Sequence, residues 1–285
     1  DDHRLEVGEE IIEAKSVVIA TGSSPKLMPM FKGLGDRLIV NDDVFEWETL
    51  PESVAVFGPG LIGIELGQAL HRLGVRIRVF GRSGSLPPLS DMAIRDYAEK
   101  VFQSEFSLDT KANLHGLERE GDQVKIRFVD REDGKEKEEN FEYVLAATGR
   151  SPNVINLGLE NTSLELDSRE VPLFDPNTMQ CGDSSIFIAG DVNNTMLLLH
   201  EAADEGRIAG DNAGRFPDIK SGMRRSPISV VFCDPQIAMV GQSWGELKGQ
   251  ENVVVGKLSF EGQGRSRVML KNKGLMHIYA DRTSG

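Results

Sequence analysis

Four short apolar runs, each containing or closed by glycine, recur along the chain. They are SVVIATG (16–22), SVAVFGPG (53–60), YVLAATG (143–149) and SIFIAGD (185–191). Continuous β-branched or aromatic runs of this length are typical of buried parallel strands, whose carboxyl ends open on a ligand crevice. Because there are four of them, the pattern predicts more than one nucleotide-binding sheet.

Helical periodicity follows the second of these runs. Apolar residues recur at helical spacing over 61–73, and Gly74 is placed to end the helix. VRIRVF (75–80) then alternates as a strand, so the stretch predicts a strand, a helix and a second strand in succession. A further helix is expected over 90–105, with Ser90 as its N-cap.

The remaining pattern predicts β-structure around one more helix. Residues 106–147 are expected to form strands with a hairpin turn at 119–123, and the charged stretch 130–140 is expected to be a solvated loop. A helical period returns at 197–214, and FPDIKSG (216–222) is interpreted as a linker. The chain after this linker is rich in strand patterns.

Composition narrows the class of protein. The 39% hydrophobic and 27% charged residues are those of a globular protein, and no apolar run approaches the roughly 20 residues of a membrane span. With 45 acidic and 32 basic residues the net charge is -13, which disfavours nucleic acid as a partner. The chain starts without an initiator Met or a secretory signal, and a cytoplasmic location is expected.

The glycines of GPGLIG (58–63) predict a dinucleotide site. Gly58 would permit a tight turn, Gly60 the close approach of a pyrophosphate, and Gly63 the packing of helix on strand. Helix amides near Leu61 and Ile62 would then face the phosphates. The alternative interpretation is an ordinary strand-to-helix turn.

The end of the second strand leaves the identity of the nucleotide open. A carboxylate at this position would bind the adenosine ribose of NAD, but the residue is Gly81 and Arg82 follows it. A cation is compatible with the 2′-phosphate of NADP, and also with a merely solvent-exposed arginine. Both NAD and NADP therefore stay open.

Five motifs occur in a characteristic order. They are ATGSSP (20–25), GPGLIGIE (58–65), ATGRSPN (147–153), IFIAGD (186–191) with LLLHEAADEG (197–206), and VVFCDPQIAMVG (230–241). With these motifs in this order, the chain resembles the pyridine nucleotide-disulfide oxidoreductase family. Within that family it resembles the dihydrolipoamide dehydrogenases most. The resemblance implies an α/β fold, with a Rossmann-like NAD(P)-binding domain inserted in a partial FAD-binding domain and followed by part of an α+β dimerisation domain.

The resemblance also implies domain boundaries and a homodimer in the full-length parent protein. The C-terminal remnant of the first FAD-domain half would cover 1–44 and the NAD(P)-binding domain 45–150. The second part of the FAD-binding domain would cover 151–220 and a partial interface domain 221–285.

Cofactor-binding residues are implied at matching positions only. For NAD(P) they are Gly58, Gly60, Leu61, Ile62, Gly63, Glu65, Arg82 and Gly149. For FAD they are Thr21, Gly22, Arg150, Gly190, Asp191, Leu198, Leu199 and His200. Glu65 resembles the family's residue near nicotinamide and flavin, the alternative being a first-turn helix acid. Asp191 would accept a ribityl hydroxyl, the alternative being a helix cap, and His200 is interpreted as a packing or hydrogen-bonding residue.

The implied activity is that of a flavoprotein passing electrons between NAD(P)(H), FAD and a dithiol/disulfide substrate, either a small molecule or a lipoyl domain. Family catalysis uses a CxxxxC pair, whereas the only cysteines are Cys181 and Cys233, whose separation suggests neither zinc nor a disulfide. No catalytic or metal-binding residue is therefore assigned, and we expect an internal fragment that neither reduces disulfides nor retains FAD. A disulfide-independent FAD/NAD(P) reductase or transhydrogenase and a non-catalytic NAD(P)-binding module are the alternatives.

Overall fold

The computed structural model describes residues 4–131 and 133–284, and the chain divides into two compact units. The first unit comprises the chain up to Ser24 together with Arg150–Ser226, and the second comprises Pro25–Gly149 with the chain from Pro227. These joints differ from the boundaries expected after residues 44 and 220, and the domain assignments stay predictions. No helix in the described residues has the length and apolar character needed to cross a membrane.

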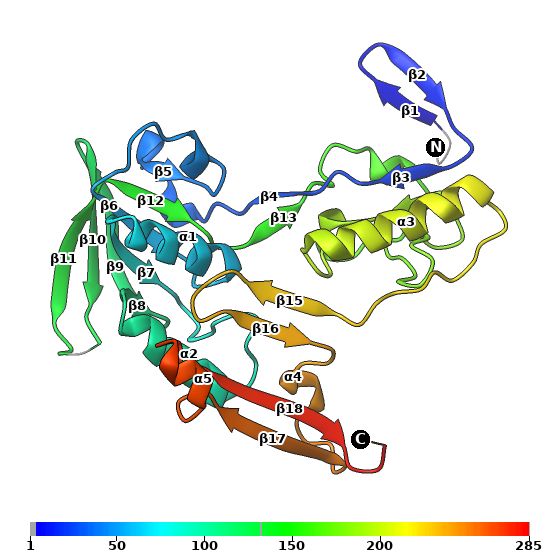
Figure 1. Cartoon of the computed structure of the whole chain (residues 1–285). Helices are drawn as coiled ribbons and strands as arrows, with labels where there is room; N and C mark the ends of the chain where they lie inside the picture. Colours follow the sequence, from blue (N-terminus) through cyan, green and yellow to red (C-terminus); the bar gives the residue numbers. More distant parts are fainter. Residues whose placement is uncertain (1–3, 132, 285) are drawn as a thin grey trace. The chain divides into compact units, whose positions relative to one another are not determined.

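A five-stranded parallel sheet forms the centre of the second unit (Figure 1). Its order is β5-β12-β6-β7-β8, and the bounds are β5 Leu38–Ile39, β12 Tyr143–Ala146, β6 Ser53–Phe57, β7 Arg76–Phe80 and β8 Ser107–Asp109. Helix α1 spans Leu61–Arg72 and α2 spans Met92–Gln103. Every residue of β6 is buried, as expected of a central parallel strand. The predicted strand, helix and strand are thus confirmed.

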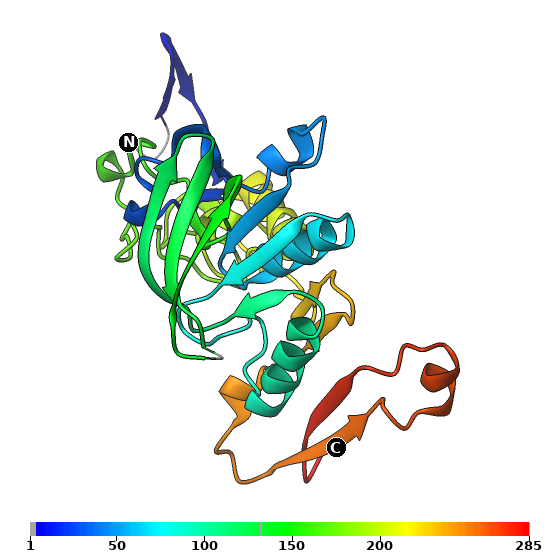
Figure 2. The ribbon, with the colours of Figure 1, turned by 90° about the vertical axis from the view of Figure 1, so that its left-hand side faces the viewer.

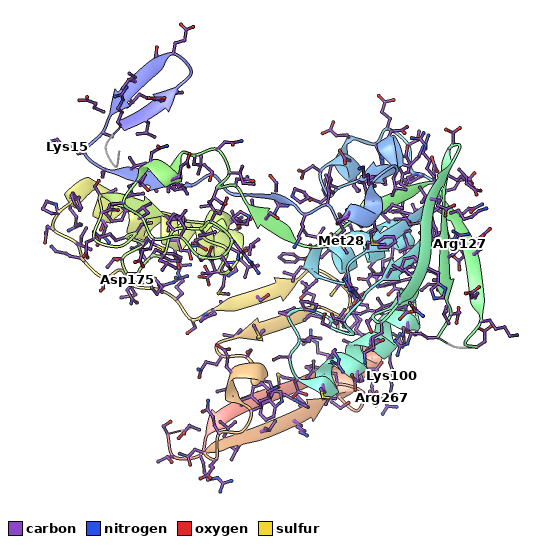
Figure 3. All side chains as sticks on the ribbon, turned by 180° about the vertical axis from the view of Figure 1, so that it is seen from behind. Lys15, Met28, Lys100, Arg127, Asp175 and Arg267 are labelled. Carbon is purple, nitrogen blue, oxygen red and sulfur yellow. The ribbon has the colours of Figure 1, made fainter. Side chains whose placement is uncertain are left out.

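The two faces of β6 pack into different cores. Val54 and Val56 belong to a core shared with α1 and α2, whereas Ala55 and Phe57 face a second core. An antiparallel sheet, the long green strands of Figure 2, forms the other wall of this second core; it contains β9 (Asn113–Glu120), β10 (Gln123–Val129) and β11 (Glu136–Phe141). Met28, labelled in Figure 3, packs against the same core. Side chains that alternate along β6 therefore pack into the cores on the two faces of the sheet.

The hairpin between β9 and β10 turns where the sequence predicts it. Gly121 has a φ of 60° in this turn. The charged loop expected at 130–140 is only partly a loop, because β11 begins at Glu136 and pairs with β10. Strand pairing depends on backbone hydrogen bonds, and charged side chains are common on an edge strand that faces solvent. The charged sequence therefore gave no sign that residues 136–141 form a strand. Residue 132 of the loop lies outside the described residues.

The N-cap of α2 is Asp91 and not Ser90, so the prediction was wrong by one residue. A side-chain oxygen of Asp91 accepts the N–H of Ala93 at 2.8 Å. The Ser90 hydroxyl instead accepts the N–H of Gly245 at 3.0 Å. Serine and aspartate are about equally good N-caps, so a tertiary contact decided between them.

The chain from Pro227 onward is rich in strands, as predicted. Its elements are β15 (Ile228–Val231), β16 (Ile237–Val240), α4 (Trp244–Leu247), β17 (Val253–Ser259), α5 (Gly264–Val268) and β18 (Leu275–Asp281). β15 pairs antiparallel with β16, and β17 pairs antiparallel with β18. Asp91 joins β18 to the start of α2, because its Oδ2 accepts from His277 Nδ1 at 2.6 Å and from the Tyr279 hydroxyl at 2.7 Å.

Acid is expected to weaken this Asp91 cluster. Burial opposes ionisation of the Asp91 carboxyl, but the hydrogen bonds from His277 and Tyr279 outweigh it and lower its pKa. The stabilisation is therefore present above the ordinary carboxyl pKa of about 4 and is lost as the pH falls through the lower folded value. Replacing Asp91 by alanine, which also removes the N-cap, should cost about 1 kcal/mol or more at neutral pH.

Urea unfolding followed by tryptophan fluorescence measures this effect, because Trp244 stacks on Tyr279 with ring centroids 5.0 Å apart. The difference in unfolding free energy between the wild-type chain and the Asp91→Ala variant should shrink on acidification. A difference that stays constant down to about pH 3 would contradict the assignment. Ser90→Ala is the matched control, since Ser90 is the neighbouring residue that does not cap α2.

The first unit is built on a parallel strand pair and one long helix. Its elements are the hairpin β1 (Arg4–Val7) and β2 (Glu10–Glu13), the parallel pair β3 (Val17–Ile19) and β14 (Ile186–Ile188), the short ladder of β4 (Ser23–Pro25) and β13 (Arg150–Pro152), and α3 (Leu199–Arg215). The expected linker after α3 is packed and is no free linker. Phe216 and Ile219 pack against the core that contains Ile208 and Ala209 of α3. The Asn212 side chain donates to the carbonyl of Lys220 and accepts from its N–H.

Candidate functional site

Three strands of the second unit end at one edge of its sheet. The N–H of Gly58 donates to the carbonyl of Phe80 at 2.8 Å, and the N–H of Ala147 donates to that of Phe57 at 2.8 Å. The loops that follow β6, β7 and β12, together with the first turn of α1, hold all the residues expected to bind NAD(P) except Glu65, which lies further along α1. They are Gly58, Gly60, Leu61, Ile62, Gly63, Arg82 and Gly149. The structure thus brings the predicted set together at the ligand edge of a parallel sheet.

The three glycines of the first loop have different surroundings. Gly58 has a φ of 108°, and a Cβ there would overlap the carbonyl oxygen of Ala147. A Cβ on Gly63 would overlap the carbonyl oxygen of Gly58. A Cβ on Gly60 would meet nothing within 4 Å. Packing within the chain therefore requires glycine at 58 and 63, while position 60 is open to a ligand.

The start of α1 suits an anion. Gly60 is the N-cap and offers no side chain to the helix amides, and no acidic residue lies in the first turn. The last turn carries Arg72, whose positive charge complements the carboxyl end of the helix dipole. The uncapped amide N–H groups near Leu61 and Ile62 can therefore donate hydrogen bonds to a pyrophosphate.

Glu65 is the fifth residue of α1 and so lies in its second turn. The alternative interpretation as a first-turn acid is therefore wrong. Its Oε1 accepts the N–H of Phe232 at 2.8 Å, a residue in the connection between β15 and β16. The carboxylate is held in place by backbone from a distant part of the sequence.

The strand end after β7 has no room for the carboxylate typical of NAD sites. A Cβ on Gly81 would lie 2.7 Å from both the carbonyl oxygen of Thr110 and Cγ of Pro59. Because one of these atoms is backbone, any side chain at this position would displace the neighbouring segment. Arg82, the next residue, is exposed.

In the first unit, β3 and β14 also end side by side. The N–H of Ala189 donates to the carbonyl of Ile19 at 3.0 Å, and Gly190 follows with a φ of 78°. Asp191 Oδ2 accepts from the Ser23 hydroxyl at 2.8 Å and lies 3.8 Å from Arg150 Nε. Oδ1 of Asp191 has no hydrogen-bond partner in the described part of the chain, so it can accept from a bound hydroxyl.

Asp191 is not a helix cap, and that alternative is wrong. The N-cap of the short 3-10 helix Asp191–Asn193 is Gly190, and this helix has no side-chain cap. Thr21 and Gly22 are fixed by Asn153, whose backbone and side chain make three hydrogen bonds of 2.7–3.0 Å to them. Ser23 and Asn153 lie within the motifs ATGSSP and ATGRSPN, but neither is among the residues predicted to bind a cofactor.

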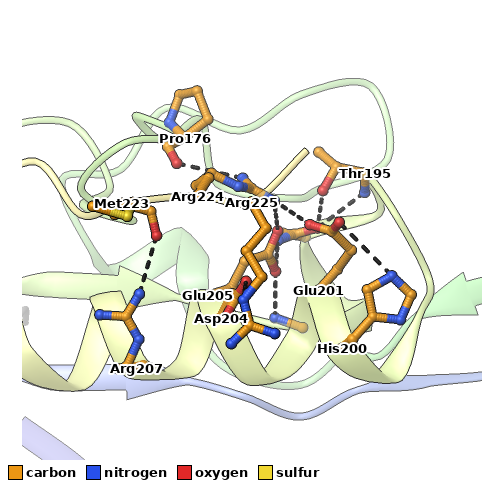
Figure 4. A network of polar contacts seen from close by, with 12 residues as sticks. Pro176, Thr195, His200, Glu201, Asp204, Glu205, Arg207, Met223, Arg224 and Arg225 are labelled. Atoms are coloured by element: carbon orange, nitrogen blue, oxygen red, sulfur yellow. Dashed lines mark hydrogen bonds and ion pairs between the residues drawn. The ribbon is translucent and has the colours of Figure 1, made fainter. Parts of the chain in front are cut away.

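A buried carboxylate on α3 holds the Gly190 loop (Figure 4). Glu205 is fully buried; its Oε2 accepts from the N–H of Gly190 at 2.8 Å and from Asn193 Nδ2 at 2.6 Å. Its Oε1 accepts from Arg224 at 3.1 Å, and Glu201 accepts from the same guanidinium nitrogen at 2.8 Å. This network was not predicted from the sequence, where its only signal is the i, i+4 spacing of the acidic residues Glu201 and Glu205 on α3.

The start of α3 holds the last three residues expected to bind FAD. Leu198 is its N-cap, and Leu199 is 88% exposed. His200 Nε2 lies 3.9 Å from Oε1 of Glu201, and Figure 4 draws these two side chains at the start of the helix. Their proposed role toward the flavin stays a prediction.

Neither cysteine has the character of a redox thiolate. Cys181 and Cys233 are both free and buried, and burial raises the pKa of Cys181 to about 12 and raises that of Cys233 as well. Within residues 4–131 and 133–284, no group of three or more His, Cys, Asp or Glu side chains could hold a metal ion.

Two family models match the chain. The one described as pyridine nucleotide-disulphide oxidoreductase matches residues 1–206, and the dimerisation domain of the same family matches residues 228–285. Dihydrolipoyl dehydrogenase of Bacillus subtilis is 29% identical over 287 residues, which cover 96% of this chain and 58% of the relative. That of Chlamydia pneumoniae is 31% identical, with 94% and 56% covered.

Solved structures share the fold. LpdA from Mycobacterium tuberculosis matches with a TM-score of 0.81 and 26% identity, over 99% of this chain and 61% of its own. The HOCl-induced flavoprotein disulfide reductase RclA from Escherichia coli matches with a TM-score of 0.81 at 20% identity, over 98% and 64%. The chain spans less than two thirds of the length of each of these proteins.

Proposed function

The chain belongs to the pyridine nucleotide-disulphide oxidoreductase family, with α/β FAD/NAD(P)-binding domains followed by a dimerisation domain, and we propose that it binds NAD(P)(H) at the Gly58–Gly63 loop. We propose further that it contributes to the FAD site of an oxidoreductase that passes electrons between NAD(P)(H), FAD and a dithiol or disulfide. The matched dimerisation domain supports a homodimer of the full protein.

The observation that carries the proposal is the contrast among the glycines. Packing within the chain accounts for Gly58 and Gly63, but nothing within the chain fills the space at Gly60, in front of the uncapped start of α1. A pyrophosphate fits this position because it needs close backbone approach and unpaired amides.

The first unit supports flavin binding through a second set of residues. The free Oδ1 of Asp191 can accept a ribityl hydroxyl, while Ser23 holds the other oxygen. Nicotinamide and flavin supply the hydride and electron transfer when bound, and the residues of the chain position them. The nucleotide would be oriented by the segments around Asp191, through Thr21, Gly22, Arg150 and Gly190.

The substrate side separates this proposal from its alternatives. Disulfide chemistry needs a reactive cysteine pair, and neither Cys181 nor Cys233 has an accessible thiolate. A disulfide mechanism would therefore require a cysteine pair from a part of the full protein that this sequence does not contain. Sequencing the gene upstream of the codon for Asp1 distinguishes the cases: a CxxxxC motif favours a disulfide substrate, and its absence favours a disulfide-independent reductase or transhydrogenase.

We expect the purified chain to bind a reduced nicotinamide nucleotide. Titration with NADPH and with NADH, followed by energy transfer from tryptophan, measures this binding. Trp47 is a reporter within the same unit, since its ring lies 5.6 Å from that of Tyr143 on β12. Saturable transfer with at least one nucleotide is the expected result, and no response to either would contradict the proposal. A visible flavin absorption band in the same sample would show that this chain also retains FAD.

A further inference from the structure

Two loops at the ligand edge of the second unit are joined by backbone hydrogen bonds. The N–H of Gly81 donates to the carbonyl of Asp109 at 2.6 Å, and that of Gly84 donates to the carbonyl of Thr110 at 2.7 Å. The N–H of Ala112 returns a bond to the carbonyl of Gly81 at 2.8 Å. The segment after β8 is therefore fixed beside the segment after β7, where the adenosine ribose of a dinucleotide is bound in this fold.

This pairing brings Lys111 to the site. A Cβ on Gly84 would overlap Cε of Lys111 and lie 2.9 Å from its Cγ, so the lysine side chain lies directly across the α-carbon of Gly84. The φ of Gly84 is 71°, so glycine suits this position in backbone conformation as well as in space. Lys111 thus stands over the Arg82–Ser85 loop although it is far from that loop in sequence.

The cations of this site have no acidic partner of their own. Arg82 and Lys111 are both exposed, and neither forms an ion pair within the described residues. The nearby carboxylates are already engaged, because Asp109 and Glu99 lie 3.3 Å and 3.7 Å from Arg131. Two exposed cations without an acidic partner on these joined loops are notable in a chain of net charge -13, because they leave positive charge available to an anion.

We propose that Lys111, with Arg82, binds the phosphate monoester on the adenosine ribose of NADP(H), and that Lys111 is a specificity-determining residue of the site. This inference rests on the proposed nucleotide function. Thr110 and Pro59 exclude from position 81 the carboxylate that would bind the unphosphorylated ribose. The hydroxyls of Ser83 and Ser85 are hydrogen-bonded to each other at 2.6 Å, and the pair leaves one neutral O–H donor on the same loop. The site therefore favours a dianion over a diol.

The test compares nucleotides with and without this phosphate. NADPH should bind at least about tenfold more tightly than NADH, as expected for charge-assisted hydrogen bonds that one ligand makes and the other lacks. Lys111→Ala should weaken NADPH about tenfold and change NADH by less than about twofold. Adenosine 2′,5′-bisphosphate should compete better than the 3′,5′ isomer, which separates NADP from other phosphorylated adenosines.

The matched control is Lys248→Ala, which removes an exposed lysine of the same unit. It should leave both affinities unchanged, and Lys111→Gln with thermal unfolding checks that the charge and not the fold is responsible. Equal weakening of NADPH and NADH by Lys111→Ala, tighter binding of NADH, or preference for the 3′,5′ isomer would overturn the inference while leaving nucleotide binding intact. Failure of both NADPH and NADH to bind would instead defeat the proposed function itself.

Discussion

Replacing Glu205 by alanine is expected to lower the free energy of unfolding of the first unit by about 3–5 kcal/mol, the usual cost of breaking a buried, hydrogen-bonded charge pair. Glu205 is fully buried and accepts hydrogen bonds from Gly190, Asn193 and Arg224. Removing it leaves the N–H of Gly190 and the amide of Asn193 without their acceptor, and each unsatisfied group costs about 1–3 kcal/mol. The Gly190 loop should therefore loosen together with α3.

The positions of the two tryptophans allow the stability of the first unit to be measured separately from that of the second. Both tryptophans, Trp47 and Trp244, lie in the second unit, so their fluorescence does not report on the first. Hydrogen exchange of the α3 amides should accelerate in Glu205→Ala, while exchange in α1 and the tryptophan emission stay as in the wild-type chain. Unchanged protection of α3 would show that Glu205 does not hold the loop.

Asp211→Ala is the matched control on the same helix. Its carboxylate is 67% exposed and pairs with Arg215 at 2.9 Å, one turn away. An exposed i, i+4 pair contributes only about 0.3–0.5 kcal/mol, so this variant should leave α3 protection nearly unchanged. Arg224→Ala should fall between the two, because Glu205 keeps its bonds to Gly190 and Asn193 when the guanidinium is removed.

The sequence predicts the nucleotide-binding core because the rules that form it are local. A run such as SVAVFGPG predicts from its own residues that a buried strand ends in a turn. The spacing of the glycines that follow matches the positions where the backbone leaves no room for a side chain. The overlap between a Cβ on Gly63 and the carbonyl of Gly58 is such a requirement, confined to six consecutive residues. Patterns of this kind predict the fold and the place of its ligand edge.

Other features depend on contacts between distant segments. Glu205 is one acidic residue among several on α3 until Gly190 and Arg224 are placed beside it. The charges of β11 suggest a loop until the ladder with β10 is seen. Lys111 likewise has no signal in sequence, because only the hydrogen bonds between two loops bring its side chain to Gly84. The local sequence pattern indicates which secondary structure a segment favours, whereas the contacts between distant segments depend on the topology of the whole fold.

Replacing Gly63 by alanine is expected to destabilise the second unit and, by displacing the Gly58 loop, to weaken nucleotide binding. The added Cβ would overlap the carbonyl oxygen of Gly58, and a Cβ contact of 3.3 Å with that of Ala147 leaves no direction for relief. Overpacking of this kind typically costs about 1–3 kcal/mol, and the upper part of that range is expected because the obstacle is backbone. Urea unfolding monitored by the fluorescence of Trp47 measures the loss.

Gly60→Ala is the informative partner of this variant. Its φ of -80° suits alanine, and a Cβ there meets nothing within 4 Å, so stability should change by less than about 1 kcal/mol. The same methyl group occupies the space through which a pyrophosphate would approach the start of α1, and NADPH should bind at least about tenfold more weakly. If Gly60→Ala kept full affinity, the loop would be a structural turn only. Loss of binding without loss of stability separates the ligand-facing glycine from the two that the fold requires.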